Sequence, residues 1–341
     1  MDKFKFILIG YGNMGRDWGK VIIQMKNVQV VGVVDLIEKN QIQACKDFCL
    51  KEEQTSDNFE RLLLTVKPDA VIDCSPPFVH YSNTIVALNN DCHIMGEKPI
   101  SLNLREAQQV VDLSIKKKVI YMVNQNYRRN PVINILQNNL EKIGKIYAIN
   151  IDYFQGLEFK DTFRYSFDHP LLLDMAIHHF DLVRMIINQN SKRVYAKEYN
   201  PEKSKFKNGS GVLVQFDMDK KLIFSYRGSW SSKGFNTSFN GIWRIVGEYG
   251  TMMWDGNLAL SIEKQAKNNK LYKENIEIPK KYLFTPYEMF LYELKENLKL
   301  FIKSISEERL PDCWCGDNIN SLKMVLSAIR SSEIGEVVNL N

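Results

Sequence analysis

Long apolar runs are missing from this sequence: no stretch reaches the roughly 18 uninterrupted apolar residues that a membrane span requires. Cysteine is scarce, and the six cysteines form none of the paired CxxC patterns that bind zinc. Lysine and arginine are spread along the chain and the net charge is only +5, so no basic patch indicates a nucleic-acid partner. We therefore expect no membrane partner, no nucleic-acid partner, and free thiols in a reducing compartment.

A strand-like apolar run begins already at Phe4, so we expect no leader segment. We therefore expect a cytoplasmic protein without a signal peptide. The chain does contain enough hydrophobic material for sizeable cores, with 45% hydrophobic residues in 341 positions. This length favours two domains over one.

A glycine-rich turn, Gly10-Tyr11-Gly12-Asn13-Met14-Gly15, organises the N-terminal part of the chain. It lies between an apolar run and a helical pattern, and a second apolar run then ends at Asp35. Strand, glycine turn, helix, strand and acidic residue in this order are typical of a dinucleotide-binding βαβ unit. The alternative is a glycine turn of an α/β protein that holds no ligand.

The identities of these residues indicate which dinucleotide is bound. Gly12 lets the backbone approach a pyrophosphate, and the helix that follows presents unpaired N–H groups to it. Asp35 can accept a hydrogen bond from a ribose 2′-hydroxyl and would repel a 2′-phosphate. Leu36 and Ile37 follow it rather than an arginine, so we predict NAD. NADP is less favoured, and it stays an alternative because Lys39 is near.

Short apolar strands alternate with helical patterns up to residue 125, which predicts a doubly wound parallel sheet covered on both faces. Beyond that point the strands alternate polar and apolar residues, as antiparallel strands with one wet face do. The predicted class is α/β, with a Rossmann domain in 1–125 and an α+β domain with a large open, mostly antiparallel sheet in 126–341. The last helix and the tail are expected to pack back on the first domain.

Several polar residues follow the predicted parallel strands, whose carboxyl ends should share one edge of the sheet. Lys98 follows one strand between Glu97 and Pro99, and it is a candidate proton donor or electrostatic clamp beside the nicotinamide. The ordinary alternative is a surface lysine. The predicted cofactor contacts are Gly10, Tyr11, Gly12, Asn13, Met14, Asp35, Ser75, Pro76, His80, Glu97, Lys98 and Gln125.

A helix is predicted over 171–188, with His178 and Asp181 each within about 40° of Asp174 on a helical wheel. The opposite side is apolar, so this stripe is expected to face away from the core. A carboxylate one turn from an imidazole can orient the ring and raise its basicity, which suits general acid–base catalysis. One alternative is a surface helix with a local Asp–His contact. The other is a metal site in which His179 joins these three side chains as a ligand. We expect His179 to have a structural role instead.

These motifs together resemble the glucose–fructose oxidoreductase/inositol dehydrogenase (Gfo/Idh/MocA) family over nearly the whole chain. The resemblance rests on Gly10–Gly15 with Asp35, Ser75-Pro76-Pro77 with His80, Glu97-Lys98-Pro99, Gln125–Arg128 with Pro131, Asp174–Asp181 and Trp243–Gly250. It implies a nicotinamide cofactor, and oxidation or reduction at a carbon of a sugar or cyclitol. It also implies Lys98, Asp174 and His178 as the catalytic group, no metal, and a homodimer or homotetramer formed through the open sheet.

The substrate itself is not named by any motif. Its predicted contacts are Lys98, Asn126, Arg128, Tyr153, Arg164, Asp174 and His178. Three other functions stay open: a nucleotide-sugar dehydrogenase or reductase, in which Arg128 and Arg129 hold phosphate; an NAD-dependent glycoside hydrolase; and a ligand-sensing protein without catalysis.

Overall fold

The computed structural model describes residues 3–156, 158–159, 163–266 and 269–340. Contacts between α-carbons divide the chain into two compact units. The first unit comprises Met1–Arg129 and Pro286–Ile319, and the second comprises Asn130–Thr285 and Asn320–Asn341. The chain leaves the first unit after Arg129 and returns to it at Pro286. The sequence predicted a single domain boundary, after residue 125.

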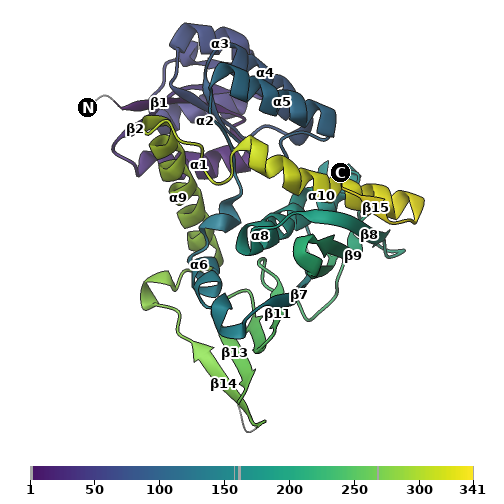
Figure 1. Cartoon of the computed structure of the whole chain (residues 1–341). Helices are drawn as coiled ribbons and strands as arrows, with labels where there is room; N and C mark the ends of the chain where they lie inside the picture. The colour runs from purple at the N-terminus through teal and green to yellow at the C-terminus, as the bar shows by residue number, and fades with distance from the viewer. Residues whose placement is uncertain (1–2, 157, 160–162, 267–268, 341) are drawn as a thin grey trace. The chain divides into compact units, whose positions relative to one another are not determined.

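The first unit is a parallel sheet with helices on its faces (Figure 1). Its strands are β1 (Phe4–Ile9), β2 (Val28–Val34), β3 (Thr55–Ser56), β4 (Ala70–Asp73), β5 (His93–Gly96) and β6 (Tyr121–Val123). Its helices are α1 (Asn13–Ile23), α2 (Glu38–Phe48), α3 (Phe59–Val66), α4 (His80–Asn89), α5 (Leu104–Lys117) and α9 (Pro286–Ser306). Each neighbouring pair in the order β3-β2-β1-β4-β5-β6 is parallel, so the predicted doubly wound sheet is confirmed.

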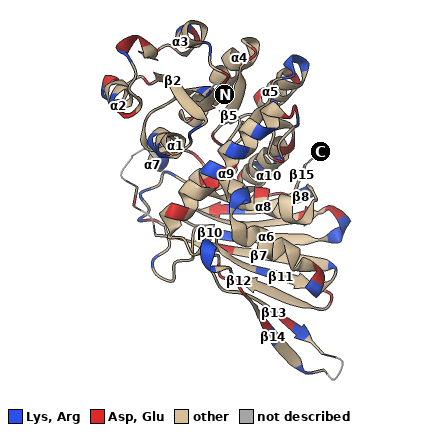
Figure 2. Cartoon of the chain, turned by 90° about the vertical axis from the view of Figure 1, so that its left-hand side faces the viewer, with Lys and Arg blue, Asp and Glu red and all other residues tan. Residues whose placement is uncertain are grey.

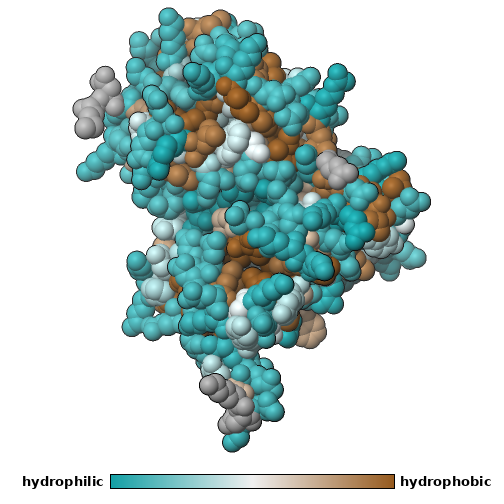
Figure 3. Space-filling view, viewed as in Figure 1, coloured by the Kyte–Doolittle hydropathy of each residue, from teal (hydrophilic) through white to brown (hydrophobic). Residues whose placement is uncertain are grey.

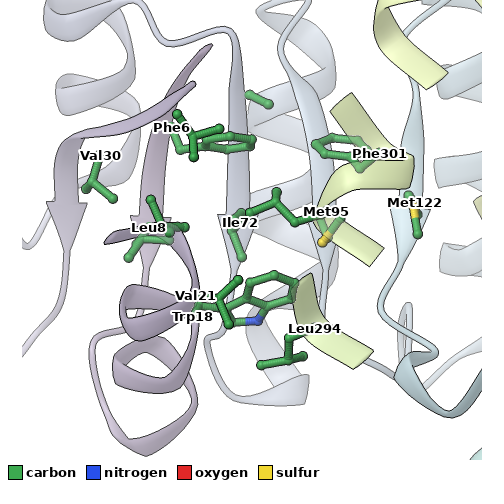
Figure 4. Packing of buried hydrophobic residues seen from close by; sticks show 14 of the residues in the cluster. Phe6, Leu8, Trp18, Val21, Val30, Ile72, Met95, Met122, Leu294 and Phe301 are labelled. Atoms are coloured by element: carbon green, nitrogen blue, oxygen red, sulfur yellow. The ribbon is translucent and has the colours of Figure 1, made fainter. Parts of the chain in front are cut away.

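The hydrophobic core of the first unit explains why α9 belongs to it. Successive side chains of a strand point to opposite faces, so Phe6 and Leu8 share one face of β1. Trp18 of α1 and Phe301 of α9 pack on that face, and both are fully buried (Figure 4). Complete burial of a phenylalanine side chain stabilises a fold by about 1.5–3 kcal/mol, so α9 is an integral layer of this unit.

Side-chain caps fix where two of these helices begin. The Asn103 side chain accepts hydrogen bonds from Arg105 N and Glu106 N at the start of α5. In α3 the cap is Asn58, whose side chain accepts from Arg61 N at 2.9 Å. Each cap satisfies a backbone N–H that has no partner within the helix.

The second unit is built on a mixed sheet with the order β14-β13-β12-β11-β7-β10-β9-β8-β15. Its strands are β7 (Ile146–Phe154), β8 (Ser191–Tyr199), β9 (Gly211–Met218), β10 (Ile223–Ser229), β11 (Ile242–Gly247), β12 (Gly250–Trp254), β13 (Leu260–Gln265), β14 (Leu271–Ile276) and β15 (Val338–Asn339). Its helical segments include α6 (Pro131–Asn138), α7 (Phe163–Ser166), a π-helix (Leu171–Ala176) and α8 (Ile177–Ile187). α10 (Cys315–Ile334) begins in the first unit and ends in the second.

Pairing within this sheet is mostly antiparallel, as predicted, except that β10 runs parallel to β7. The sequence missed β13, which is part of a largely exposed hairpin with little apolar patterning. The C-terminal tail forms β15 and pairs with β8, so it packs on the second unit. The expectation that the tail returns to the first unit was wrong, because backbone hydrogen bonds to an available sheet edge hold it here.

The two faces of the second sheet differ sharply. Ile149, Tyr226 and Trp243 lie on the covered face and are fully buried, whereas Tyr195 and Leu213 are about half exposed. Figure 2 shows acidic and basic residues interspersed along the strands and helices of both units rather than gathered by sign. Figure 3 shows a surface that is mostly hydrophilic, with hydrophobic residues in separate patches.

None of the helices in the described ranges combines the length and the apolar character that crossing a membrane requires.

Candidate functional site

The carboxyl ends of the parallel strands lie in register along one edge of the first unit. Ile9 at the end of β1 pairs with Val34 of β2 and with Asp73 of β4. Asp73 pairs in turn with Gly96 of β5, which pairs with Val123 of β6. The glycine turn, Asp35, Ser75, Lys98 and Gln125 each follow one of these strand ends, so the structure brings their backbones to a common edge.

The glycine turn has the geometry of a phosphate cradle. Gly10 has φ +84°, and a Cβ there would lie 2.9 Å from the Cys74 carbonyl oxygen. A Cβ on Gly15 would lie 2.0 Å from the Gly10 carbonyl oxygen, so only glycine permits α1 to start this close to β1. A Cβ on Gly12 would meet nothing within 4 Å, which leaves open space beside the backbone at the start of α1. A helix N-terminus facing open space suits a pyrophosphate.

Asp35 is fixed by its surroundings. Its Oδ2 accepts hydrogen bonds from Tyr11 N at 2.6 Å and from Asn40 Nδ2 at 3.1 Å. Its Oδ1 accepts from Ile37 N at 2.8 Å. The carboxylate therefore joins the glycine turn to the start of α2, in the position where a ribose hydroxyl is expected. Arg16 lies nearby, since its guanidinium donates to Asn40 Oδ1 at 3.2 Å.

Glu97 is partly buried and directly precedes Lys98. Its Oε1 accepts hydrogen bonds from Trp18 Nε1 at 3.1 Å and from Asn124 Nδ2 at 2.7 Å. Asn297 of α9 donates to Asn124 Oδ1 at 2.7 Å and completes the cluster. Burial raises the pKa of Glu97, while the hydrogen bonds from Asn124 and Trp18 and the Lys98 charge oppose the rise. Sequence reasoning missed Trp18 and Asn297, because no short motif contains them.

His80 joins two of the strand-end loops. Its ring is buried, with Nδ1 at 2.7 Å from the Pro99 carbonyl oxygen and Nε2 at 2.8 Å from the Ser75 carbonyl oxygen. Ser75 is held as well, because its hydroxyl and its N–H both donate to Asp73 Oδ1. Both ring nitrogens of His80 therefore face backbone carbonyls, and its direct contact with the cofactor stays a prediction.

The residues after β6 hold α9 and α10. Asn126 Nδ2 donates to Glu293 Oε2 at 2.7 Å, and Arg128 forms an ion pair with Asp317 at 2.7 Å. Arg128 is buried, and Arg129 is paired with Asp312. These arginines stabilise the first unit itself, and a substrate role for Asn126 or Arg128 stays a prediction.

In the second unit, Asp174 lies in the π-helix that precedes α8. π-Helical turns are rare and occur frequently at functional sites. The Asp174 carboxylate accepts a hydrogen bond from Arg164 Nε at 2.8 Å. The guanidinium of Arg164 also lies over the Phe159 ring, 5.0 Å from its centroid. His178 is the second residue of α8 and is only 6% exposed, and its pairing with Asp174 stays a prediction.

Only part of the polar stripe predicted on this helix can face away from the core, because its Asp181 end is buried. Asp181 is 1% exposed and accepts a hydrogen bond from Ser321 Oγ of α10 at 2.7 Å. Arg184 donates to the same hydroxyl at 2.9 Å. The expectation was wrong for Asp181 because α10 covers the polar side of α8, while Phe180 packs on the sheet through Phe216.

His179 is structural, as the sequence suggested. Its ring nitrogens lie 3.2 Å from the Tyr226 hydroxyl and 3.1 Å from the Phe239 carbonyl oxygen, and burial lowers its pKa to about 4. Tyr153 is buried beside it, and its hydroxyl accepts a hydrogen bond from Trp230 Nε1 at 2.9 Å. Within the described ranges, no cluster of three or more His, Cys, Asp or Glu side chains is placed to hold a metal ion.

The fold and the edge residues of the first unit define a dinucleotide-binding α/β protein. Residues 4–125 match the family model described as "Oxidoreductase family, NAD-binding Rossmann fold", and residues 139–253 match "GFO/IDH/MocA C-terminal domain". The chain belongs to the Gfo/Idh/MocA family of oxidoreductases. The predictions of this family, of a dehydrogenase or reductase, and of NAD as cofactor are thereby confirmed.

Two relatives with named activities each match about half of this chain and about half of their own length. Glucose-6-phosphate 3-dehydrogenase of Bacillus subtilis is 26% identical over 52% of this chain and 52% of that enzyme. Myo-inositol 2-dehydrogenase of Thermotoga maritima is 25% identical over 55% of this chain and 56% of that enzyme. The crystal structure of myo-inositol 2-dehydrogenase from Lactobacillus plantarum superimposes with a TM-score of 0.82 at 18% identity, covering 100% of both chains.

Asp35 is expected to set the preference for NAD. We predict that Asp35→Ser lowers the affinity for NAD by about tenfold, because it removes a charged hydrogen-bond acceptor. It should raise the affinity for NADP, because the repulsion of a 2′-phosphate is lost while Arg16 remains nearby. Fluorescence titration with both cofactors measures the change, with exposed Glu38→Gln as control. Unchanged affinities for both cofactors would contradict this role of Asp35.

His169 should make stability depend on pH. Its Nδ1 lies 2.6 Å from Glu198 Oε2, and this hydrogen bond raises the pKa of His169. The contact then stabilises the folded state fully at pH values below the pKa of His169 in the unfolded chain, about 6.5. This stabilisation is lost as the pH rises through the higher pKa of His169 in the folded protein. We predict that His169→Gln reduces the free energy of unfolding more at pH 6 than at pH 9 in urea titrations. An equal loss at both values would contradict the ion pair.

Proposed function

We propose that this chain transfers hydride between NAD and a secondary alcohol or ketone of a sugar, cyclitol or sugar derivative. The observation that carries the proposal is the register of strand ends, which puts Lys98 on the same sheet edge as the glycine turn and Asp35. A cationic side chain beside a dinucleotide site suits the stabilisation of an oxyanion. The named activities of the sugar and inositol dehydrogenases support this substrate class.

The proposed chemistry divides between three side chains. Bound NAD supplies the hydride acceptor. His178 accepts the proton of the substrate hydroxyl, and Lys98 stabilises the developing alkoxide through its ammonium charge. Asp174 orients His178, and Arg164 holds the Asp174 carboxylate through the 2.8 Å contact within the second unit. Ketone reduction follows the same path in reverse, with His178 returning the proton.

The experiment that tests the proposal compares His178→Ala with the wild type on a panel of polyols, sugars and nucleotide sugars. Loss of a general base should lower kcat on the best substrate by about 10²–10⁴-fold and leave the Kd for NAD nearly unchanged. Nicotinamide absorbance measures turnover, and product analysis without a net absorbance change would reveal redox-neutral chemistry.

The control for this experiment is His93→Gln, because His93 begins β5 at the end opposite to Lys98. It should retain wild-type turnover. If His178→Ala retained it as well, His178 would not be the base.

We further propose that copies of the chain associate through the open face of the second sheet, in the cytoplasm. Tyr195 and Leu213 are 47% and 51% exposed on neighbouring strands of that face, which supports an apolar contact. Sedimentation velocity should give a dimer or tetramer for the wild type and a monomer for Tyr195→Lys/Leu213→Lys. A monomeric wild type would contradict this arrangement.

A further inference from the structure

A cavity of about 480 Å³ opens at one end of the mixed sheet in the second unit. Phe154 and Ser229, the last residues of the parallel strands β7 and β10, pair with each other at this end. Gly211, the first residue of β9, pairs with Ser229. The described walls therefore come from the segment after β7, the β8–β9 connection and the β10–β11 connection. A volume of this size is typical of small-molecule sites.

Aromatic rings form the inner wall of this cavity. Phe206 stacks on Trp230 with the ring centroids 5.8 Å apart, and Tyr165 lies 5.0 Å from Phe206. Phe206 and Trp230 are 5% and 3% exposed, so their positions are fixed by packing. Phe159 also packs against Trp230, with the ring centroids 5.1 Å apart, so Phe206 and Trp230 form a closed and rigid floor. Tyr165 is only partly buried, and it is the ring with surface left for the apolar side of a sugar.

The rim of the cavity is positively charged. Lys203, Lys205 and Lys233 line it, together with one acidic residue, Glu158, among the lining residues described. Lys205 is paired with Glu158 at 2.8 Å. Lys203 and Lys233 come from different loops and have no acidic partner within the described part of the chain. Two ammonium groups converging on one cavity suit a phosphate or a carboxylate.

Hydroxyl groups lie between the aromatic wall and the charged rim. Ser204 Oγ and Ser231 Oγ both line the cavity and lie 3.0 Å apart. Ser231 Oγ also donates to the buried Ser210 Oγ at 2.9 Å, which fixes this pair in place. Such hydroxyls can donate to or accept from a polar ligand.

The cavity adjoins the residues to which we assign the chemistry. Tyr165, in its wall, follows Arg164 directly, and Arg164 Nε lies 2.8 Å from the Asp174 carboxylate. Both contacts are within the second unit. The cavity and Asp174 are therefore connected through the consecutive residues Arg164 and Tyr165.

We propose that this cavity binds the anionic end of the substrate, and that the substrate is a sugar bearing a phosphate or carboxylate away from the reacting carbon. This inference rests on the proposed function and names its substrate class. The aromatic wall contacts the sugar ring, and Lys203 and Lys233 hold the anion.

The test measures binding by calorimetry on the full-length protein with NAD, using glucose 6-phosphate, glucuronate and glucose as probes. The wild type should bind one anionic sugar at least about tenfold more tightly than glucose, because charge-assisted contacts of this kind contribute about that much. Lys203→Gln/Lys233→Gln should abolish the preference and leave glucose binding unchanged. The matched control is Lys220→Gln/Lys221→Gln in the turn between β9 and β10. This turn lies at the end of β9 and β10 that is opposite to the cavity.

Each outcome decides one question. A preference for glucose 6-phosphate or for glucuronate identifies the anion. Equal binding of all three sugars, or a preference that survives in the Lys203→Gln/Lys233→Gln variant, overturns the inference. Turnover is recorded separately by nicotinamide absorbance. Oxidation of neutral sugars without any preference for an anionic sugar would agree with the proposed function and contradict only the inference about the cavity. Lysine-dependent binding without turnover on any sugar would contradict the proposed function.

Discussion

The hydrogen-bonded, partly buried carboxyl group of Glu97 is the interaction on which the cofactor side of this protein depends. It receives hydrogen bonds from Trp18 in α1 and Asn124 after β6, and Asn297 of α9 supports Asn124. A buried acid is costly unless its oxygens are hydrogen-bonded, so these elements must pack together for the first unit to be stable. The same cluster fixes the strand end from which Lys98 emerges and the helix that begins at the glycine turn.

This dependence explains why the sequence revealed only part of the first unit. The glycine turn, Asp35 and Lys98 were predictable because local rules apply: only glycine fits at Gly15, and parallel strand ends share an edge. Trp18 and Asn297 were not predictable as partners of Glu97. They are separated from it by 79 and 200 positions, and nothing local indicates that α9 returns to the first unit.

The helix that carries Asp174 and His178 in the second unit shows a different limit. A wheel at about 100° per residue assumes one regular helix, but Leu171–Ala176 is π-helical and changes the angular spacing before α8 begins. The wheel also assumes that a polar stripe faces water. In α8 that stripe meets α10, where Asp181 and Arg184 share the Ser321 hydroxyl. Helical pattern identifies which side is apolar, but it does not identify what covers the other side.

The order of strands in the mixed sheet accounts for the remaining difficulty. Residues lining the cavity follow β7, β8 and β10, and they are up to about 80 positions apart. They meet because β10 pairs parallel with β7 and antiparallel with β9, so loops at the same end of these strands become neighbours. An alternating pattern predicts strands but not their partners. The cofactor site depends on backbone geometry, which glycines make visible in sequence, whereas the proposed substrate cavity depends on side chains of loops that only strand pairing brings together.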